Sequence, residues 1–239
     1  TIAGVSSGIW VCVDFGLSTP QAATRAKQTT IPAVGRIRSP NGCRAAKPIL
    51  QRMAIITGRG GFPEVVLKNS HGTARISALG ATVLSWIPNG QEDILWVSPR
   101  ATFQLGSAIR GGVPVCWPWF ASDPAHPDGP SHGLVRTRRW AVERHADSEA
   151  SFAISHHESS VFPAFRLTLE VRLGVALKLS LTHHNLSDDE VGCTGALHAY
   201  FAADASRATV SGLGSGTAFD KILQREREID DPLRCQGPI

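Results

Sequence analysis

The sequence predicts an all-β protein built as an antiparallel β-sandwich. From Arg166 to Thr182 apolar residues alternate with polar ones almost without interruption, which is typical of strands with one buried and one solvated face. Helical periodicity is almost absent. Neither a GxGxxG nor a GxxxxGK(S/T) sequence occurs, which argues against the nucleotide-binding α/β folds.

The first half of the expected sandwich contains short runs rich in β-forming residues, broken by Gly, Asn and Pro. We expect strands at Glu64–Lys68, Ala74–Ser77, Thr82–Trp86 and Asp93–Val97. The long alternating stretch exceeds the usual strand length of about 3–10 residues. It therefore predicts two antiparallel strands with a turn near Gly174.

Residues 1–53 differ from the rest, and we expect a poorly structured basic extension there, followed by the sandwich at 54–239. The extension holds seven Lys/Arg and one acid, a net charge of +6, whereas the other 17 basic and 19 acidic residues give −2. Two interpretations stay open. In the first, translation begins at Met53, the only methionine, and residues 1–52 are upstream sequence or an unfolded extension. In the second, these residues are an organellar targeting segment.

The composition argues against several classes of protein. Hydrophobic residues make up 42% and charged residues 18%, as in globular proteins. No apolar run of about 18 residues is present, so we expect no membrane partner. The near-neutral body lacks the basic face that nucleic-acid binding needs. Five scattered cysteines without a CxxC pair indicate reduced thiols, and we expect a cytoplasmic protein.

The first stretch that could carry chemistry is IRGGVPVCWPWF, residues 109–120. Arg110 stands beside Gly111 and Gly112, and a guanidinium next to unshielded amides commonly holds phosphate or carboxylate. The prolines fix φ, and three aromatics offer a surface on which a sugar could stack: Trp117, Trp119 and Phe120. The alternative is a proline-stiffened core loop with one surface arginine.

The second stretch, SHGLVRTRRW at 131–140, follows a loop rich in Pro, Gly and Asp. Loops of this kind often carry function on a rigid scaffold. His132 and Arg136 would point from one loop if the chain turns at Gly133. The alternative is a solvated basic turn.

The third stretch is GALHAYF at 195–201, where His198 interrupts an apolar, strand-like run. A histidine in such a place is often a satisfied core residue. Its ordinary pKa nevertheless makes it a natural proton donor near neutral pH.

Two pairs of adjacent histidines also stand in β-like segments, His156–His157 and His183–His184. Neighbouring residues of a strand point to opposite faces. A metal site in a β-barrel would want its ligands on one face, so we expect no metal ion.

Taken in order, IRGGVPVCWPWF, SHGLVRTRRW and LHAYF closely resemble the motifs of the D-hexose-6-phosphate mutarotases. These proteins are also called glucose-6-phosphate 1-epimerases and belong to the aldose 1-epimerase superfamily. The flanking segments DILWVSPRATF and ATVSGLGSGTAFDK are similar as well. The resemblance runs from about Glu64 to the end of the chain.

The resemblance implies a large antiparallel β-sandwich of the galactose mutarotase-like type, which interconverts the α and β anomers of a hexose 6-phosphate without a cofactor. By the matching motifs, Arg110 and Arg136 would bind the phosphate, His132 would line the sugar site, and His198 would be the catalytic histidine. Asp204 resembles a ligand of a sugar hydroxyl, although the segment after Phe201 is about one residue shorter than in the family.

The resemblance also implies a general-base glutamate on a later strand, after an NPW-like segment that this sequence lacks. Glu226 and Glu228 lie in the run QREREIDD, which we interpret as a solvated connection. We therefore expect the base beyond residue 239, a sandwich that is incomplete at its C-terminus, and a fragment that is itself inactive if the base is missing.

Three hypotheses follow for the function. The chain is an isomerase that opens and recloses the sugar ring by acid/base catalysis, with glucose 6-phosphate as the expected substrate. Alternatively, it is a non-catalytic sugar-phosphate-binding β-sandwich without the base, or a sandwich that only mediates contacts. We expect a monomer in each case.

Overall fold

The computed structural model describes residues 9–15, 54–122, 127, 129–211, 214, 216–220, 223–229 and 232–234. In these ranges every regular element is a strand except η1, a short 3-10 turn at Arg59–Gly61. The predicted all-β class is therefore confirmed. None of the described residues forms a helix with the length and apolarity that a bilayer crossing requires.

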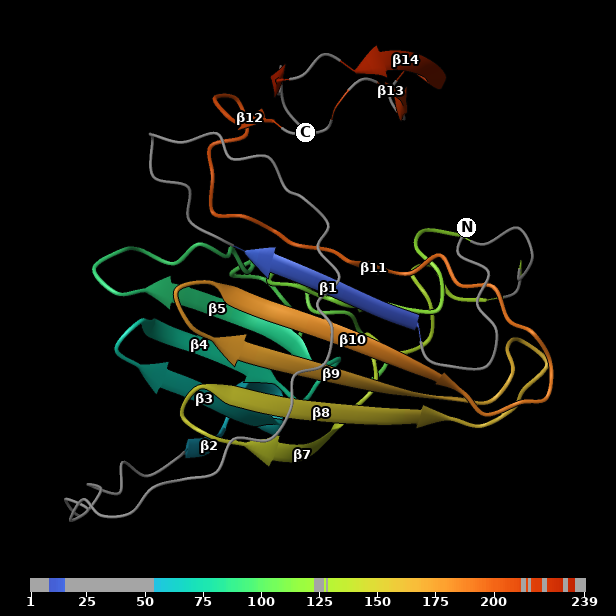
Figure 1. Cartoon of the computed structure of the whole chain (residues 1–239), viewed down its shortest axis with the longest axis horizontal. Helices are drawn as coiled ribbons and strands as arrows, with labels where there is room; N and C mark the ends of the chain where they lie inside the picture. Colours follow the sequence, from blue (N-terminus) through green and yellow to red (C-terminus); the bar gives the residue numbers. More distant parts are fainter. Residues whose placement is uncertain are drawn as a thin grey trace, which may run out of the picture.

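Two antiparallel sheets form the body of the molecule and lie face to face as two layers (Figure 1). The four-stranded sheet has the order β2-β3-β4-β5, and the five-stranded sheet has the order β1-β10-β9-β8-β7. The strands of the first sheet are β2 (Ala54–Thr57), β3 (Pro63–Asn69), β4 (Gly72–Ser77) and β5 (Thr82–Pro88). Those of the second are β1 (Ile9–Phe15), β7 (Ala141–His145), β8 (Glu149–His156), β9 (Phe165–Leu173) and β10 (Leu177–Asn185).

The core fills the space between the two sheets. One continuous cluster of buried side chains takes Leu67 and Ile76 from the first sheet and Phe152, Leu167 and Leu169 from the second. Burial of this apolar surface stabilises the sandwich by about 25 cal/mol per Å² removed from water. The predicted antiparallel sandwich is therefore confirmed.

The alternating stretch forms the hairpin β9–β10, as predicted. The turn lies at Gly174, whose amide donates to the carbonyl of Ala176. The residues of one parity are buried in both strands, namely Leu167, Leu169, Val171, Leu173, Leu177, Leu179 and Leu181. Val175 has the same parity but lies in the turn and is exposed.

Three of the four earlier strand predictions are confirmed by β3, β4 and β5, and the fourth is wrong. Asp93–Val97 makes only single bridges, from Leu95 to Phe201 and from Val97 to Gly111. The amide of Trp96 donates to Tyr200, and its carbonyl accepts from Gly112. This segment is divided between two partners, so it cannot continue along one ladder.

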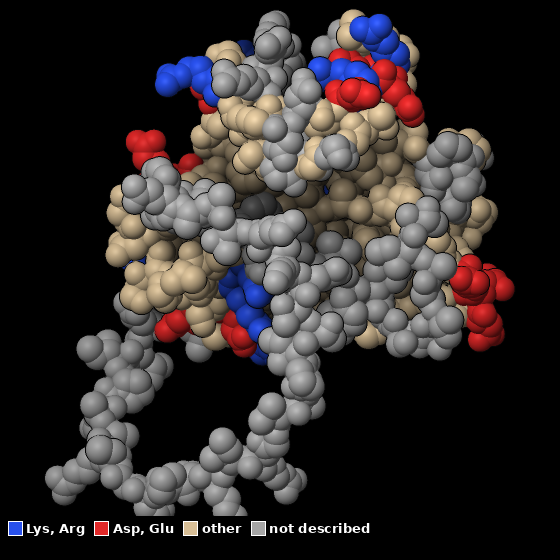
Figure 2. Space-filling view, turned by 45° about the horizontal axis from the view of Figure 1, so that its top comes forward, with Lys and Arg blue, Asp and Glu red and all other residues tan. Residues whose placement is uncertain are grey.

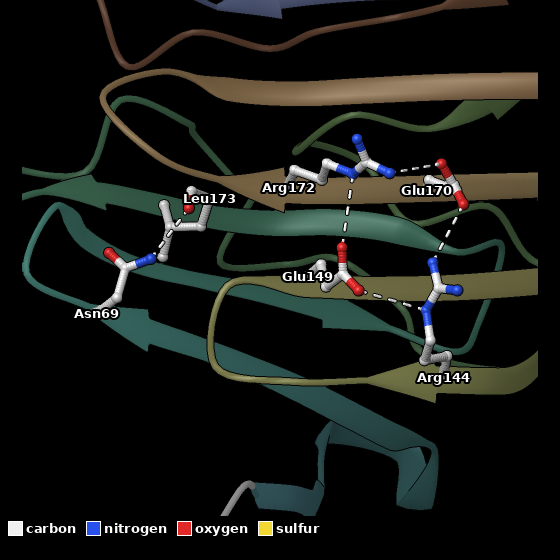
Figure 3. Close-up of polar contacts among 6 residues, drawn as sticks. All are labelled: Asn69, Arg144, Glu149, Glu170, Arg172 and Leu173. Carbon is white, nitrogen blue, oxygen red and sulfur yellow. Dashed lines mark hydrogen bonds and ion pairs between the residues drawn. The ribbon is translucent and has the colours of Figure 1, made fainter. Parts of the chain in front are cut away.

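The outer face of the five-stranded sheet carries charged side chains that pair across β7, β8 and β9 (Figure 3). Four ion pairs of 3.2–3.6 Å join them in a ring: Arg144, Glu149, Glu170 and Arg172. Exposed pairs of this kind contribute about 0–1 kcal/mol each. These ion pairs identify the solvated face. A separate hydrogen bond joins the two sheets, in which the side chain of Asn69 donates to the carbonyl of Leu173 at 3.0 Å.

The N-terminal segment contributes β1, which pairs with β10 from Ile9 opposite His183 to Phe15 opposite Leu177. The rest of residues 1–53 lies outside the described residues. The basic extension, and with it the boundary at 53, therefore stays a prediction.

The C-terminal segment forms small two-stranded sheets that lie beyond the sandwich in Figure 1. Here β12 (Thr209–Val210) pairs with β15 (Leu233–Arg234), and β13 (Gly216–Asp220) pairs with β14 (Arg225–Ile229). The described residues of QREREIDD are mostly exposed, as a solvated connection requires, but five of them form the strand β14. Both charge signs fit this strand because its side chains are exposed and Arg227 pairs with Asp220 at 3.5 Å.

Candidate functional site

The segment 109–120 lies between the other two stretches that the sequence singles out. Its short strand β6 (Val115–Cys116) pairs with β11 (Ala196–Leu197), which leads directly into His198. The amide of His198 donates to the carbonyl of Pro114 at 3.1 Å. On the other side, Trp117 bridges Gly133. The fold thus brings together stretches that lie up to about 90 positions apart in the sequence.

Two of the predicted site residues, His132 and His198, lie next to Phe120 and next to each other. The ring centroids of Phe120 are 4.8 Å from His132 and 5.5 Å from His198, and the His198 ring is stacked on Phe120. The two imidazoles are 6.3 Å apart. Phe120 is 37% exposed, so this group of rings is accessible from solvent.

His132 is held by its neighbours in a defined orientation. Its backbone has φ 65°, and its amide donates to the carbonyl of Ala121 at 2.7 Å. In return Nδ1 of the ring accepts from the amide of Ala121 at 3.0 Å. A neutral imidazole with Nδ1 as acceptor carries its proton on Nε2, so His132 is oriented to donate a hydrogen bond from Nε2.

His198 packs on the ring of Tyr200 at 4.7 Å and on Phe120. Its Nδ1 is buried and has no hydrogen-bond partner in the described part of the chain. An unpaired buried polar group costs about 1–3 kcal/mol. A ligand hydroxyl or a water that satisfied this nitrogen would remove that cost, which suits a group that exchanges protons with a substrate.

Of the two predicted phosphate ligands, Arg136 is the better defined. Its Nη2 donates to the carbonyl of Ser131 at 2.9 Å, and its Nε is buried without a partner in the described ranges. Arg110 has an exposed side chain, and its carbonyl accepts from the amide of Ser98. A clamp made by the two guanidinium groups stays a prediction.

The glycines after Arg110 serve close packing rather than an open anion cradle. The amide of Gly112 donates to the carbonyl of Trp96 at 2.8 Å, so it is not available to a phosphate. A Cβ at Gly112 would lie 2.1 Å from the carbonyl oxygen of Val83, and one at Gly111 would lie 2.4 Å from Cα of Val97.

The expectation that three aromatics offer a stacking surface is wrong for two of them. Trp117 and Trp119 are only 2% and 1% exposed and belong to the core. Their indole nitrogens bond within the protein, from Trp117 to Nδ1 of His183 at 2.8 Å and from Trp119 to the carbonyl of Pro130 at 3.0 Å. Phe120 alone is left as an exposed ring of this motif.

Asp204 lies in an exposed turn and bonds within it. Its Oδ1 accepts from the amide of Ser206 at 3.0 Å and from the hydroxyl of the same residue at 2.6 Å. To bind a sugar, this carboxylate would have to give up its bonds to Ser206 and accept from a sugar hydroxyl instead. The role of Asp204 as a sugar ligand stays a prediction.

Two further aromatics extend the row of rings, and sequence reasoning missed both. Tyr200 lies between His198 and Trp96, with its ring centroid 4.7 Å from the first and 6.3 Å from the second. Trp96 is 40% exposed. The available signal was the period of two, since residues 198 and 200 of a β-like run share a face.

The described cysteines are free thiols that do not suit nucleophilic chemistry. Burial raises the pKa of Cys193 to about 12. Burial also raises the pKa of Cys116, an effect that the nearby Arg136 partly offsets. In the described ranges no group of three or more His, Cys, Asp or Glu is arranged to hold a metal ion.

The histidine pair on β10 points to opposite faces, as predicted, with His183 buried and His184 exposed. Burial, and to a lesser extent the nearby His184, lowers the pKa of His183 from 6.5 to about 4. Between these values the unfolded chain binds a proton that the folded chain excludes. The free energy of unfolding should therefore fall as the pH drops from about 6.5 to about 4, by up to about 3 kcal/mol.

Urea unfolding at several pH values between about 7 and 4 tests this expectation. The His183→Asn variant lacks the titrating ring and should lose this part of the pH dependence. The same pH dependence in both proteins would assign the effect to other groups.

Charge is mixed on the face shown in Figure 2, where positive and negative side chains lie near one another and uncharged residues cover most of the described surface. No single-sign basic patch dominates this face.

Comparison with known proteins adds independent information on this arrangement. Residues 63–229 match the family model described as "Aldose 1-epimerase". The chain is 35% identical over 204 residues to "Putative glucose-6-phosphate 1-epimerase" of Escherichia coli K12, covering 80% of this chain and 66% of that protein. A protein of Cenchrus ciliaris with the same description is 30% identical, covering 70% and 55%.

Solved structures show the same fold. A "putative mutarotase" from Salmonella typhimurium aligns with a TM-score of 0.61 and 30% identity, covering 75% of this chain and 65% of that chain. The Slr1438 protein of Synechocystis aligns with a TM-score of 0.62 and 19% identity, covering 72% and 65%. The chain thus spans about two thirds of the length of the Escherichia coli relative.

Proposed function

The chain belongs to the aldose 1-epimerase family, and from this premise we propose that it interconverts the α and β anomers of a hexose 6-phosphate. The observation that carries the proposal is the grouping of His132 and His198 around the accessible ring of Phe120, with the two imidazoles 6.3 Å apart. The curated relatives described as glucose-6-phosphate 1-epimerases support glucose 6-phosphate as the substrate.

The reaction requires the sugar ring to open and close again. A base takes the proton of the C1 hydroxyl while an acid protonates the ring oxygen, so the C1–O5 bond breaks and an aldehyde forms. After rotation about C1–C2 the ring closes from the other face. Each positioned proton transfer contributes about 10²–10⁴-fold to the rate.

In this proposal His198 is the group that exchanges a proton with the ring oxygen. Its Nδ1 is buried and lacks a partner in the described part of the chain, and its ring is stacked on Phe120. His132 lines the sugar site beside Phe120, and its Nδ1 is engaged by the amide of Ala121. Phe120 packs against the apolar face of the sugar.

The arginines are assigned to the phosphate, which takes no part in the bond changes. Binding energy from a remote group can orient the reacting carbon. Arg136 follows His132 in the same loop, and its buried Nε lacks a partner in the described ranges. A phosphate oxygen would satisfy this donor, and Arg110 would supply a second positive charge.

We expect Arg110→Ala to raise KM for glucose 6-phosphate by about 10-fold or more, because a charge-assisted hydrogen bond contributes about 1.5–3 kcal/mol. The variant should leave KM for free glucose unchanged and so remove the preference for the phosphorylated sugar. Arg144→Ala, on the solvated face of the five-stranded sheet, serves as the control. An equal loss with both sugars would contradict the phosphate assignment.

A second candidate function is sugar-phosphate binding without catalysis. It is favoured by the positions of the three acidic residues that the sequence analysis considers for the site. Asp204 is bonded within its own turn, and Glu226 and Glu228 are exposed on β14, so none of the three matches the general base that catalysis needs.

Magnetisation-transfer NMR on glucose 6-phosphate separates the two candidates. With the full-length protein we expect anomer exchange above the spontaneous rate. Binding detected by calorimetry without faster exchange would support the second candidate. A chain that neither binds nor accelerates exchange would overturn both and leave a sandwich that only mediates contacts. The monomeric state, the cytoplasmic location and the independence from cofactors stay predictions.

A further inference from the structure

Trp117 contacts both histidine-bearing segments and the five-stranded sheet. It belongs to the segment 109–120 but contributes no exposed ring. Its backbone contacts the loop of His132, its indole packs on the strand that leads to His198, and its N–H reaches β10.

The backbone of Trp117 supports the turn that orients His132. Trp117 and Gly133 form a parallel bridge, and the carbonyl of Trp117 accepts from the amide of Leu134 at 2.7 Å. A Cβ at Gly133 would lie 2.1 Å from that carbonyl oxygen. The residue after His132 therefore lies directly against the Trp117 backbone, and a shift of one moves the other.

The indole of Trp117 supports the segment that carries His198. Gly195 lies against the ring so closely that a Cβ there would be 2.1 Å from Cε3. Three residues later the amide of His198 bonds to Pro114, so this strand is held between the indole and the backbone of the segment 109–120. Rotation of the indole would displace Gly195 and the residues after it.

The rotation of the indole is limited by a buried hydrogen bond. Nε1 of Trp117 donates to Nδ1 of His183 at 2.8 Å, across 66 positions in the sequence. His183 is itself fixed on β10, with its ring stacked on Phe165 at 5.3 Å. The hydrogen bond to His183 therefore fixes the orientation of the Trp117 indole relative to the five-stranded sheet.

From these contacts we propose that Trp117, held by its hydrogen bond to His183, is a positioning residue that sets the relative placement of His132 and His198. The proposal rests on the proposed function for its catalytic consequence, since neither Trp117 nor His183 is exposed to a substrate. A displacement of a catalytic group by about 1 Å can lower a rate by about 10²-fold.

A pair of substitutions at His183 separates the hydrogen bond from simple packing. His183→Asn keeps an acceptor oxygen close to the position of Nδ1, whereas His183→Leu fills a similar volume without an acceptor. Two readouts apply to the whole chain: the NMR signals of the His132 and His198 rings, and kcat and KM for anomer exchange of glucose 6-phosphate. The indole N–H signal of Trp117 reports directly on the bond.

We expect His183→Leu to shift both histidine signals, to speed hydrogen exchange of the Trp117 indole, and to lower kcat by about 10-fold or more. KM should change by less than about two-fold, because the arginines are not contacted. His183→Asn should keep the wild-type histidine signals and retain kcat within about three-fold.

Wild-type histidine signals and kcat in His183→Leu would overturn the proposal, as would equal losses in the Leu and Asn variants, which would indicate packing alone. If His183→Leu does not fold, Trp117→Phe removes the same donor while keeping an aromatic ring, and it should shift the same signals. A wild-type chain without exchange activity would refute the proposed function, while the histidine signals would still test the positioning.

Discussion

Replacing His198 with alanine is expected to lower kcat for anomer exchange by about 10²–10⁴-fold, the range typical of a lost general acid or base. The reason lies in the environment of this ring. Its Nδ1 is buried beside Phe120 and Tyr200 and has no partner in the described part of the chain. Binding should persist, because the phosphate is assigned to Arg110 and Arg136.

The measurement is exchange NMR on glucose 6-phosphate together with a calorimetric dissociation constant for each variant. His184→Ala provides the control, since it removes a histidine that is exposed on β10. A dissociation constant that rises as much as kcat falls would make His198 a binding residue. Unchanged turnover in His198→Ala would remove it from the mechanism.

The sequence predicts well those features that depend on local periodicity. The leucines of β9 and β10 alternate with polar residues because each strand has one face in the core, and this pattern is visible without any partner. The order of the three motifs also predicts that His132 and His198 belong to one site. Their placement next to Phe120 and to each other could not be predicted, because it depends on how β6 and β11 pair.

Other features are set by contacts between distant segments and therefore leave no local signal. In a motif rich in aromatics, Trp117 and Trp119 look like residues that stack on a sugar, but both are buried in the core. The bond from Trp117 to His183 joins residues 66 positions apart. Charged residues 225–229 form a strand because both faces of that hairpin are solvated, a situation that hides the usual alternation.

The two glycines after Arg110 illustrate the same limit. Next to an arginine they suggest amides open to a phosphate, and the sequence does not distinguish this from a need for close packing. In the structure Gly111 and Gly112 lie against the backbones of Val97 and Val83. The backbone after Arg110 thus passes so close to the backbones of Val97 and Val83 that no side chain fits between them. This backbone crossing fixes the position of Arg110 before any ligand is bound.

Gly112→Ala is consequently expected to destabilise the protein strongly. Gly112 has φ 68°, and its Cβ would lie 2.1 Å from the carbonyl oxygen of Val83. The left-handed backbone alone costs an alanine about 1–2 kcal/mol. The clash with a rigid backbone adds to this, so we expect a total loss of about 3 kcal/mol or more in the free energy of unfolding.

Gly90→Ala separates the two contributions, because Gly90 has a similar φ of 75° but nothing within 4 Å of its Cβ position. Urea unfolding of both variants, followed by tryptophan fluorescence, should give a loss of about 1–2 kcal/mol for Gly90→Ala. The additional loss in the free energy of unfolding for Gly112→Ala then measures the cost of the clash with the backbone of Val83. Equal losses at the two positions would mean that the crossing adjusts freely, and Arg110 would lose its fixed support.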